Sequence, residues 1–120
     1  MLKRLHRITQ KKDFDKFFGP KFRKSGGYSN STPDLIIKSL KNRSEISRFA
    51  FVISTKVDKR ATKRNLIKRR LREIVRARLP RISGGYDVLI IAQKGIADAD
   101  FARLERDVDQ IFRKLRLIVK

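Results

Sequence analysis

The sequence predicts a single α+β domain, and three observations lead to this fold class. The chain has 120 residues, which is enough for one modest hydrophobic core and too few for two. Apolar residues recur at helical spacing in the segments 10–18, 62–79 and 98–115. The segments 35–40, 48–55 and 86–93 have the composition and length of strands. No internal repeat is visible, so we expect one mixed domain.

The first helix is expected over residues 10–18. Thr9 can cap its start, and Gly19 followed by Pro20 ends it. Phe14, Phe17 and Phe18 lie at positions i, i+3 and i+4 and make one aromatic stripe. Residues 21–33 are rich in Gly, Ser and Asn, and this composition predicts a mobile loop with at most a short irregular strand.

Two strands are expected next, over residues 35–40 and 48–55, with a polar turn at 41–47 between them. Phe49, Phe51 and Ile53 alternate with other residues and share one face of the second strand. Because the two strands are neighbours in sequence, we expect them to pair as a hairpin. A third strand, 86–93, is apolar along most of its length and is predicted to lie buried in the sheet.

The helices at 62–79 and 98–115 each have one apolar face. In the first, Ile67, Leu71, Ile74 and Val75 fall within an arc of roughly 100°, the width of a stripe that faces a core. Pro80 ends this helix. The stripe predicted to face inward in the second helix consists of Phe101, Leu104, Val108, Ile111, Phe112 and Leu115.

Positive charge is concentrated on the helix at 62–79 and on the loop before it. The chain carries a net charge of +20, and half of it lies in residues 56–81, where Asp58 and Glu73 are the only acids. On the helix face opposite the apolar stripe lie Asn65, Lys68, Arg69, Arg72 and Arg76, with Arg64 at the rim. Like charges four residues apart repel, so this face is unfavourable without an anionic partner. Charge alone suits DNA, RNA and acidic lipid equally.

Composition excludes several other classes of protein and site. The chain has no cysteine, which excludes disulfides and thiolate metal sites. Its longest apolar runs are too short to span a membrane, and no signal-length apolar stretch follows the basic start, so we expect a cytoplasmic protein with no membrane partner. His6 is the only histidine, and Asp13 and Asp15 are expected to be solvated, so we predict neither a catalytic nor a metal site.

A longer motif distinguishes between DNA, RNA and acidic lipid as the partner. It consists of a strand, Arg-Phe-Ala-Phe-Val-Ile-Ser-Thr-Lys at residues 48–56, then Lys-Arg-Ala at 59–61, and then Lys-Arg-Asn-Leu-Ile-Lys-Arg-Arg-Leu-Arg-Glu at 63–73. This order closely resembles the signature of the protein subunit of bacterial ribonuclease P. The resemblance extends to Arg4-Leu5, Phe14, Phe17-Phe18, residues 86–95 and the final helix, with 21–33 the poorest part.

The resemblance implies a protein cofactor of a ribonucleoprotein in which RNA carries out the chemistry. Its partners would be the catalytic RNA and precursor tRNA, whose 5′ leader is removed by hydrolysis that uses Mg²⁺ held mainly by the RNA. No small-molecule substrate and no catalytic side chain of the protein are implied. The positions that match the RNA-binding residues of the family are Lys56, Lys59, Arg60, Arg64, Asn65, Lys68, Arg69, Arg72 and Arg76.

The resemblance also implies a cleft for the single-stranded leader and a specific fold. The matching cleft positions are Phe14, Phe18 and Phe51, whose rings could stack on unpaired bases. The implied fold is a single α/β sandwich over residues 1–120 in the order αβββαβα. This implied fold is of the ribosomal protein domain 2-like type, and it has a four-stranded sheet and a left-handed βαβ crossover. Asp58 departs from the small turn residue common in the family.

Three alternatives share some of these features. A ribosomal-type structural RNA-binding protein would have the same size and basicity. A helix-in-groove transcription factor would bind duplex DNA, usually as a dimer. A protein nuclease would need acids or histidines that this chain does not arrange. None of the three accounts for the ordered motif at 48–73.

Overall fold

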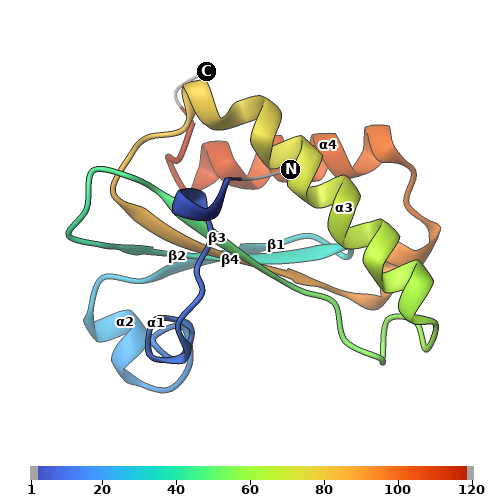
Figure 1. Ribbon diagram of the computed structural model, residues 1–120, viewed down its shortest axis with the longest axis horizontal. Coiled ribbons are helices and arrows are strands. Elements are labelled where there is room, and N and C mark those ends of the chain that lie inside the picture. The colour runs from blue at the N-terminus through green and yellow to red at the C-terminus, as the bar shows by residue number, and fades with distance from the viewer. Residues whose placement is uncertain (1–2, 119–120) are drawn as a thin grey trace.

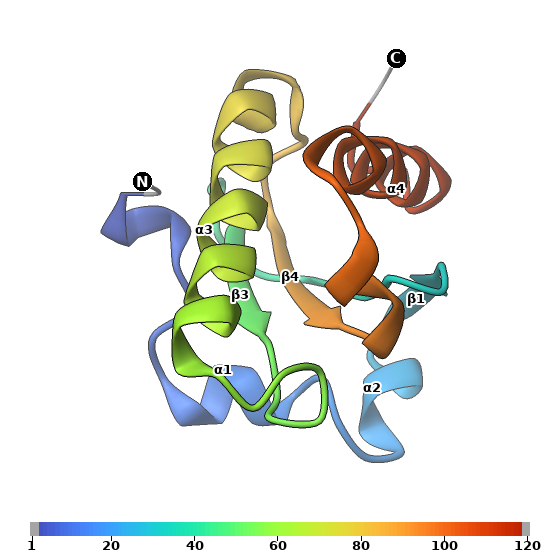
Figure 2. The same ribbon diagram turned by 90° about the vertical axis from the view of Figure 1, so that its right-hand side faces the viewer.

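The fold is a four-stranded sheet with two long helices on one face and two short helices on the other. We describe residues 3–118 of a computed structural model. Figures 1 and 2 show α3 and α4 together on one side of the sheet and α1 and α2 on the opposite side. The helices are η1 (Arg4–His6), α1 (Lys11–Asp15), α2 (Lys21–Lys24), α3 (Ala61–Arg78), η2 (Leu79–Arg81), η3 (Lys94–Asp98) and α4 (Phe101–Lys114); the strands are β1 (Tyr28–Ser31), β2 (Leu35–Lys41), β3 (Arg48–Val52) and β4 (Tyr86–Ala92).

The strand order in the sheet is β1-β2-β4-β3. β4 pairs antiparallel with β2 and parallel with β3, so the predicted hairpin between β2 and β3 is wrong. β4 takes the central place because its apolar side chains can be buried on both faces. Val88, Leu89 and Ile90 are all fully buried. The chain passes from β3 through α3 to β4 as the parallel crossover of the expected αβββαβα order.

Hydrophobic clusters lie on both faces of the sheet. The larger one fills the space under α3 and α4 and includes Phe49, Leu71 and Phe112. The four residues Ile67, Leu71, Ile74 and Val75 of α3 are buried in it, as their spacing predicted. The smaller cluster, on the side of α1 and α2, consists of Phe17, Phe22, Leu40 and Leu89.

The N-terminal third differs most from the sequence prediction. The expected helix at 10–18 is only the short α1, and Gln10 rather than Thr9 precedes it, with no side-chain cap. The expected loop at 21–33 contains α2 and the edge strand β1. The aromatic stripe is divided, because Phe17 is fully buried while Phe18 is 46% exposed. Short helices contribute little by themselves, and packing decides their ends.

The C-terminal helix matches its predicted inner face except at its start. Asp100 caps α4 by accepting a hydrogen bond of 2.8 Å from the backbone N–H of Arg103. Leu104, Val108, Ile111 and Phe112 are buried. Phe101, predicted to face inward, is 42% exposed. The preceding η3 turn buries Ile96 and Ala99, and these residues join the core in its place.

Candidate RNA-binding surfaces

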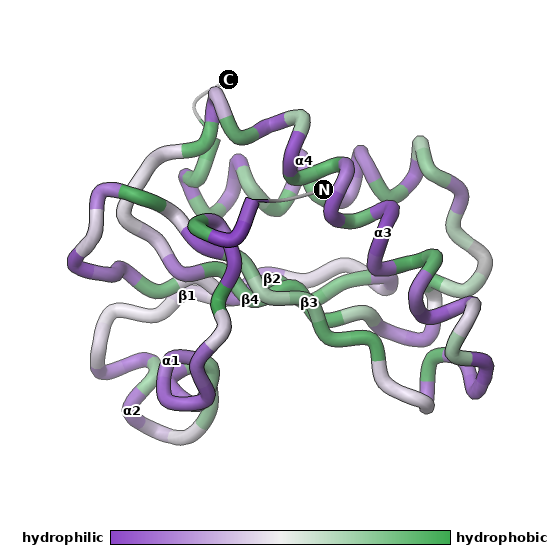
Figure 3. Tube along the Cα trace, viewed as in Figure 1, coloured by the Kyte–Doolittle hydropathy of each residue, from purple (hydrophilic) through white to green (hydrophobic). Residues whose placement is uncertain are grey.

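The outer face of α3 presents its cations to solvent. Asn65, Arg69 and Arg76 are exposed, and Lys68 and Arg72 are partly exposed. Figure 3 shows the hydrophilic turns of α3 against the hydrophobic strands beneath them. This amphipathic arrangement fixes the cations on a rigid support, because the buried stripe anchors the helix to the sheet.

A shallow hollow of about 460 Å³ lies on this face, lined by Asn65, Lys68, Arg69, Arg72 and Glu73. Glu73 accepts a hydrogen bond of 2.9 Å from Arg76, so one cation of the predicted row is paired with an acid. That pairing holds the pKa of the Glu73 carboxyl below its usual range. Lys68, Arg69 and Arg72 have no carboxylate partner among residues 3–118, and the hollow remains strongly positive.

The loop before α3 is held in place by its own charged residues. Arg60 forms a hydrogen-bonded ion pair with Asp58 at 3.0 Å, and the Asp58 carboxyl also accepts a bond from the backbone N–H of Arg60. These bonds lower the pKa of Asp58 to about 2. Arg64 donates to the backbone carbonyls of Asp58 and Lys59 at 2.9 and 2.8 Å. Asp58 therefore shapes the loop that presents the exposed side chains of Lys56, Lys59 and Arg60.

One arginine of the basic segment is turned inward. Arg78, at the end of α3, is buried and donates to Asp109 and Glu105 of α4, the second at 3.0 Å. It also donates to the carbonyl of Ile74 at 3.0 Å. Arg78 thus joins the two long helices, and its charge is not part of the α3 surface.

A second hollow, of about 250 Å³, lies along the edge strand β3 and is lined by Arg7, Ile8, Phe14, Phe49, Ala50, Phe51 and Arg72. We call it the β3-edge cleft. The N-terminal segment forms one wall, because the Ile8 N–H donates to the Phe49 carbonyl at 2.9 Å. The buried Nε atoms of Arg7 and Arg72 have no hydrogen-bond partner in the described part of the chain. Such donors suit a phosphate or a base edge.

The three predicted leader contacts do not all lie in one place. Phe14 and Phe51 both line the β3-edge cleft, although Phe51 also packs against the core under α3. Phe18 lines a neighbouring hollow with Lys12, Lys16 and Lys41. The rings of Phe14 and Phe18 are 5.4 Å apart, so the two hollows adjoin through an aromatic pair. Lys38 Nζ stands 4.8 Å from the centre of the Phe18 ring.

The sequence analysis did not identify Arg7, which lines the β3-edge cleft, or Lys38, which lies beside the Phe18 ring. Arg7 reaches the cleft because it bridges to Phe49 as a parallel partner, a contact between segments 42 residues apart. Lys38 lies on the sheet face that carries Leu40, where a strand pattern predicts a solvated side chain. No local signal in the sequence could have placed either one.

Two acids of the described chain, Asp13 and Asp87, hold Arg48 in place. Asp13, predicted to be solvated, is buried at 3.3 Å from Arg48, which also binds Asp87 at 2.7 Å. Among the residues that the structure describes, no three His, Cys, Asp or Glu side chains come together as metal ligands. Over the same part of the chain, no helix is long and apolar enough to cross a membrane.

A four-stranded α+β sandwich that keeps one cationic helix face open beside an aromatic cleft defines a class of RNA-binding protein. The sequence model described as Ribonuclease P matches residues 2–116. The chain belongs to the ribonuclease P protein family, whose members act with a catalytic RNA in processing the 5′ end of precursor tRNA. The holoenzyme is an endoribonuclease.

Individual relatives can be aligned with nearly the whole chain. The ribonuclease P protein component of Microcystis aeruginosa is 32% identical over 117 residues, covering 98% of this chain and 96% of the relative. That of Synechococcus elongatus is 32% identical over 123 residues, covering 98% and 95%. The solved RNase P protein of Thermotoga maritima is 26% identical with a TM-score of 0.76, covering 90% of this chain and 96% of that one. The protein from Staphylococcus aureus, at 21% identity, a TM-score of 0.82 and coverage of 95% and 98%, supports the fold.

Proposed function

We propose that the outer face of α3 and the loop before it hold the catalytic RNA, while the β3-edge cleft and the adjoining hollow beside Phe18 hold the single-stranded leader of precursor tRNA. The observation that carries this proposal is the division of α3 into a buried apolar face and an open cationic face. Arginine and asparagine on the open face can bind both phosphates and base edges, which a folded RNA displays together. The proposed contacts are Lys56, Lys59, Arg60, Arg64, Asn65, Lys68, Arg69, Arg72 and Arg76.

The β3-edge cleft suits an unpaired strand. Phe14 and Phe51 offer ring surface on which bases of any sequence can stack, at about 1–3 kcal/mol for each base. Arg7 and Arg72 line the same cleft, and their guanidinium groups can bind the strand's phosphates. Arg72 also lines the hollow on α3. Through Arg72 the leader and the catalytic RNA would lie side by side on the protein.

The protein's part in cleavage is positioning. Its described residues supply no three-ligand cluster for a divalent cation, so they do not fit a protein-held catalytic metal. We therefore propose that the RNA holds the Mg²⁺ that hydrolysis requires. The cations of the protein would reduce phosphate repulsion between catalytic RNA and substrate. We propose a cytoplasmic place of action, since bacterial tRNA precursors are made and processed there.

Site-specific cross-linking tests this division of roles. Because the chain has no cysteine, a single cysteine can carry one photoreactive label. A label at Asn65→Cys should cross-link the catalytic RNA in the holoenzyme, and one at Phe18→Cys should cross-link the leader. Gln110→Cys, on an exposed position of α4, is the matched control and should give neither product. Leader cross-links from position 65, or none from position 18, would contradict the assignment.

A further inference from the structure

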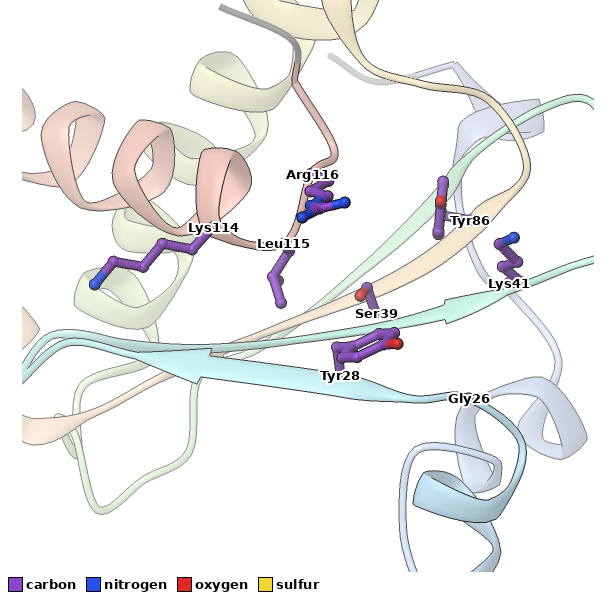
Figure 4. A pocket seen from close by; sticks show the side chains of 8 residues that line it. All are labelled: Gly26, Tyr28, Ser39, Lys41, Tyr86, Lys114, Leu115 and Arg116. Carbon is purple, nitrogen blue, oxygen red and sulfur yellow. The ribbon is translucent and has the colours of Figure 1, made fainter.

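A fourth hollow lies past the end of α4. It shares Lys41 with the hollow beside Phe18 and has no lining residue in common with the α3 hollow or the β3-edge cleft. Its volume is about 470 Å³, and it is lined by Gly26, Tyr28, Ser39, Lys41, Tyr86, Lys114, Leu115 and Arg116. Figure 4 shows Leu115 and Arg116 on the helix side and Tyr28 and Ser39 on the sheet side, with Tyr86 and Lys41 farther along. No carboxylate lines it. We call it the tyrosine hollow.

Both tyrosines of the chain meet in this hollow. Tyr28 pairs across the sheet with Ser39, and Tyr86 pairs with Lys41, so the small Ser39 side chain leaves space between the two rings. Tyr28 is 68% exposed. Neither phenol has a hydrogen-bond partner among residues 3–118. The exposed Tyr28 ring and the partly buried Tyr86 ring, from segments 58 residues apart, together form a larger stacking surface than a single exposed side chain usually does.

Arg116 occupies a backbone position that favours glycine. Its φ is 60°, and it is the only non-glycine residue in the described chain with a positive φ. It follows the C-cap Leu115, where a left-handed residue commonly closes a helix and is usually Gly. An arginine in this backbone conformation is less stable than a glycine would be. Such a residue suggests a role for the side chain, which lines the hollow (Figure 4).

We propose that the tyrosine hollow binds an unpaired segment of RNA. One or both rings would stack on bases, and the side chains of Arg116 and Lys41, which have no acidic partner in the described chain, would bind phosphates. The hollow involves the edge strand β1, whereas the β3-edge cleft lies at the other edge of the sheet. Figure 2 shows α3 over the β3 side and α4 toward β1. The tyrosine hollow is therefore a separate site from the β3-edge cleft.

Tyrosine fluorescence reports on this site directly, because the chain has two tyrosines and no tryptophan. Titration of the free protein with a short oligouridine should quench tyrosine emission, after correction for absorption with free tyrosine. Arg116→Gly should raise the midpoint about tenfold, the effect of losing one charge-assisted hydrogen bond. Because glycine suits φ of 60°, the same variant should keep or gain thermal stability, which separates lost binding from lost folding.

Arg106→Ala is the charge-matched control, since Arg106 is an exposed cation of α4 outside all four hollows. It should shift the midpoint by about twofold at most. The proposal would be overturned if the oligouridine did not quench tyrosine emission, or if Arg116→Gly and Arg106→Ala shifted the midpoint equally. It would also be overturned if quenching were lost in Phe14→Ala and kept in Arg116→Gly. None of these outcomes bears on leader cleavage by the holoenzyme, so the two proposals fail separately.

The source of the RNA segment is a second question for the holoenzyme. A photoreactive label at Tyr28→Cys should cross-link RNA in the complex with precursor tRNA. A product with the catalytic RNA identifies a third protein contact on that RNA, and a product with the precursor identifies a substrate segment outside the β3-edge cleft. Cross-linking to neither RNA would contradict the proposal.

Discussion

Three arginines of the basic segment differ in what surrounds the guanidinium group. Arg69 is exposed on α3, Arg72 has a buried Nε without a described partner, and Arg78 is buried against Asp109. The same residue type therefore serves as a surface charge, a donor in the β3-edge cleft and a structural link. Aromatic residues divide in the same way, since Phe17 is core while Phe14 lines the cleft.

The Phe14 ring is expected to contact the leader. Phe14→Ala should weaken binding of leader-bearing precursor tRNA by about 1–2 kcal/mol, the range for loss of one base stack, and leave mature tRNA nearly unchanged. Affinities of the holoenzyme for both RNAs measure the difference. Phe22→Ala is the control, because Phe22 is buried. This substitution should lower the stability of the protein without weakening the binding of precursor tRNA more than that of mature tRNA. Equal losses for precursor and mature tRNA would assign Phe14 to packing.

Asp107 is expected to make stability depend on pH. Burial, and then the neighbouring Asp34 carboxylate, raise the pKa of Asp107 to about 6. The pKa of Asp107 is lower in the unfolded chain, so between the unfolded and the folded pKa the native state keeps a proton that the unfolded state has lost. The free energy of unfolding therefore falls as the pH rises through this window and levels off above about pH 6. Asp107→Asn should therefore stabilise the protein by about 1–2 kcal/mol at pH 7.5 and by about a third of that amount at pH 4.5.

Urea unfolding at the two pH values measures this effect. The control is Asp15→Asn, an exposed acid of α1, which should change stability little at either pH. The same gain for Asp107→Asn at pH 4.5 as at pH 7.5 would show that titration of Asp107 is not its cause.

At the scale of elements, α3 combines two functions on one helix. Its inner face could be predicted from sequence, because helical spacing alone determines which side chains share a face. Its outer face could be predicted too, although the pairing of Arg76 with Glu73, three residues earlier, was missed. The ion pair of the buried Arg78 could not be predicted, because it needs Asp109. Asp109 comes from α4, and no local pattern shows that α4 packs beside α3.

Arg69→Ala should weaken binding to the catalytic RNA and reduce the salt dependence. One phosphate contact fewer releases about one counterion fewer, so the slope of log affinity against log salt should fall by about 1. Titrations at several salt concentrations give the slope. Arg106→Ala removes the same charge from α4 and should leave the slope nearly unchanged. An unaltered slope in Arg69→Ala would place the interface elsewhere.

Arg78→Ala should destabilise the protein because it leaves Asp109 and Glu105 without their shared cation. Loss of a buried partner costs several kcal/mol, and partial exposure of both acids lowers our expectation to about 2 kcal/mol. Chemical denaturation of Arg78→Ala and Arg69→Ala compares one substitution on the two faces of α3. The exposed Arg69→Ala should change stability by less than about 0.5 kcal/mol, and equal losses would contradict a structural role for Arg78.

At the scale of the molecule, local pattern predicted the elements better than their arrangement. The helices α3 and α4 and the strands β2 and β4 lie close to their expected positions. The order β1-β2-β4-β3 could not follow from adjacency, because β4 enters between two strands that precede it in sequence. The β3-edge cleft escaped prediction for the same reason, since its wall forms when residues 7 and 8 pair with β3.

The most direct test of the whole account is reconstitution at low magnesium. The purified protein, the catalytic RNA and precursor tRNA together should release the 5′ leader far faster than the RNA alone, because the cationic face of α3 offsets phosphate repulsion that magnesium would otherwise screen. The protein without the RNA should cleave nothing. Cleavage by the protein alone, or no gain over the catalytic RNA, would contradict the account.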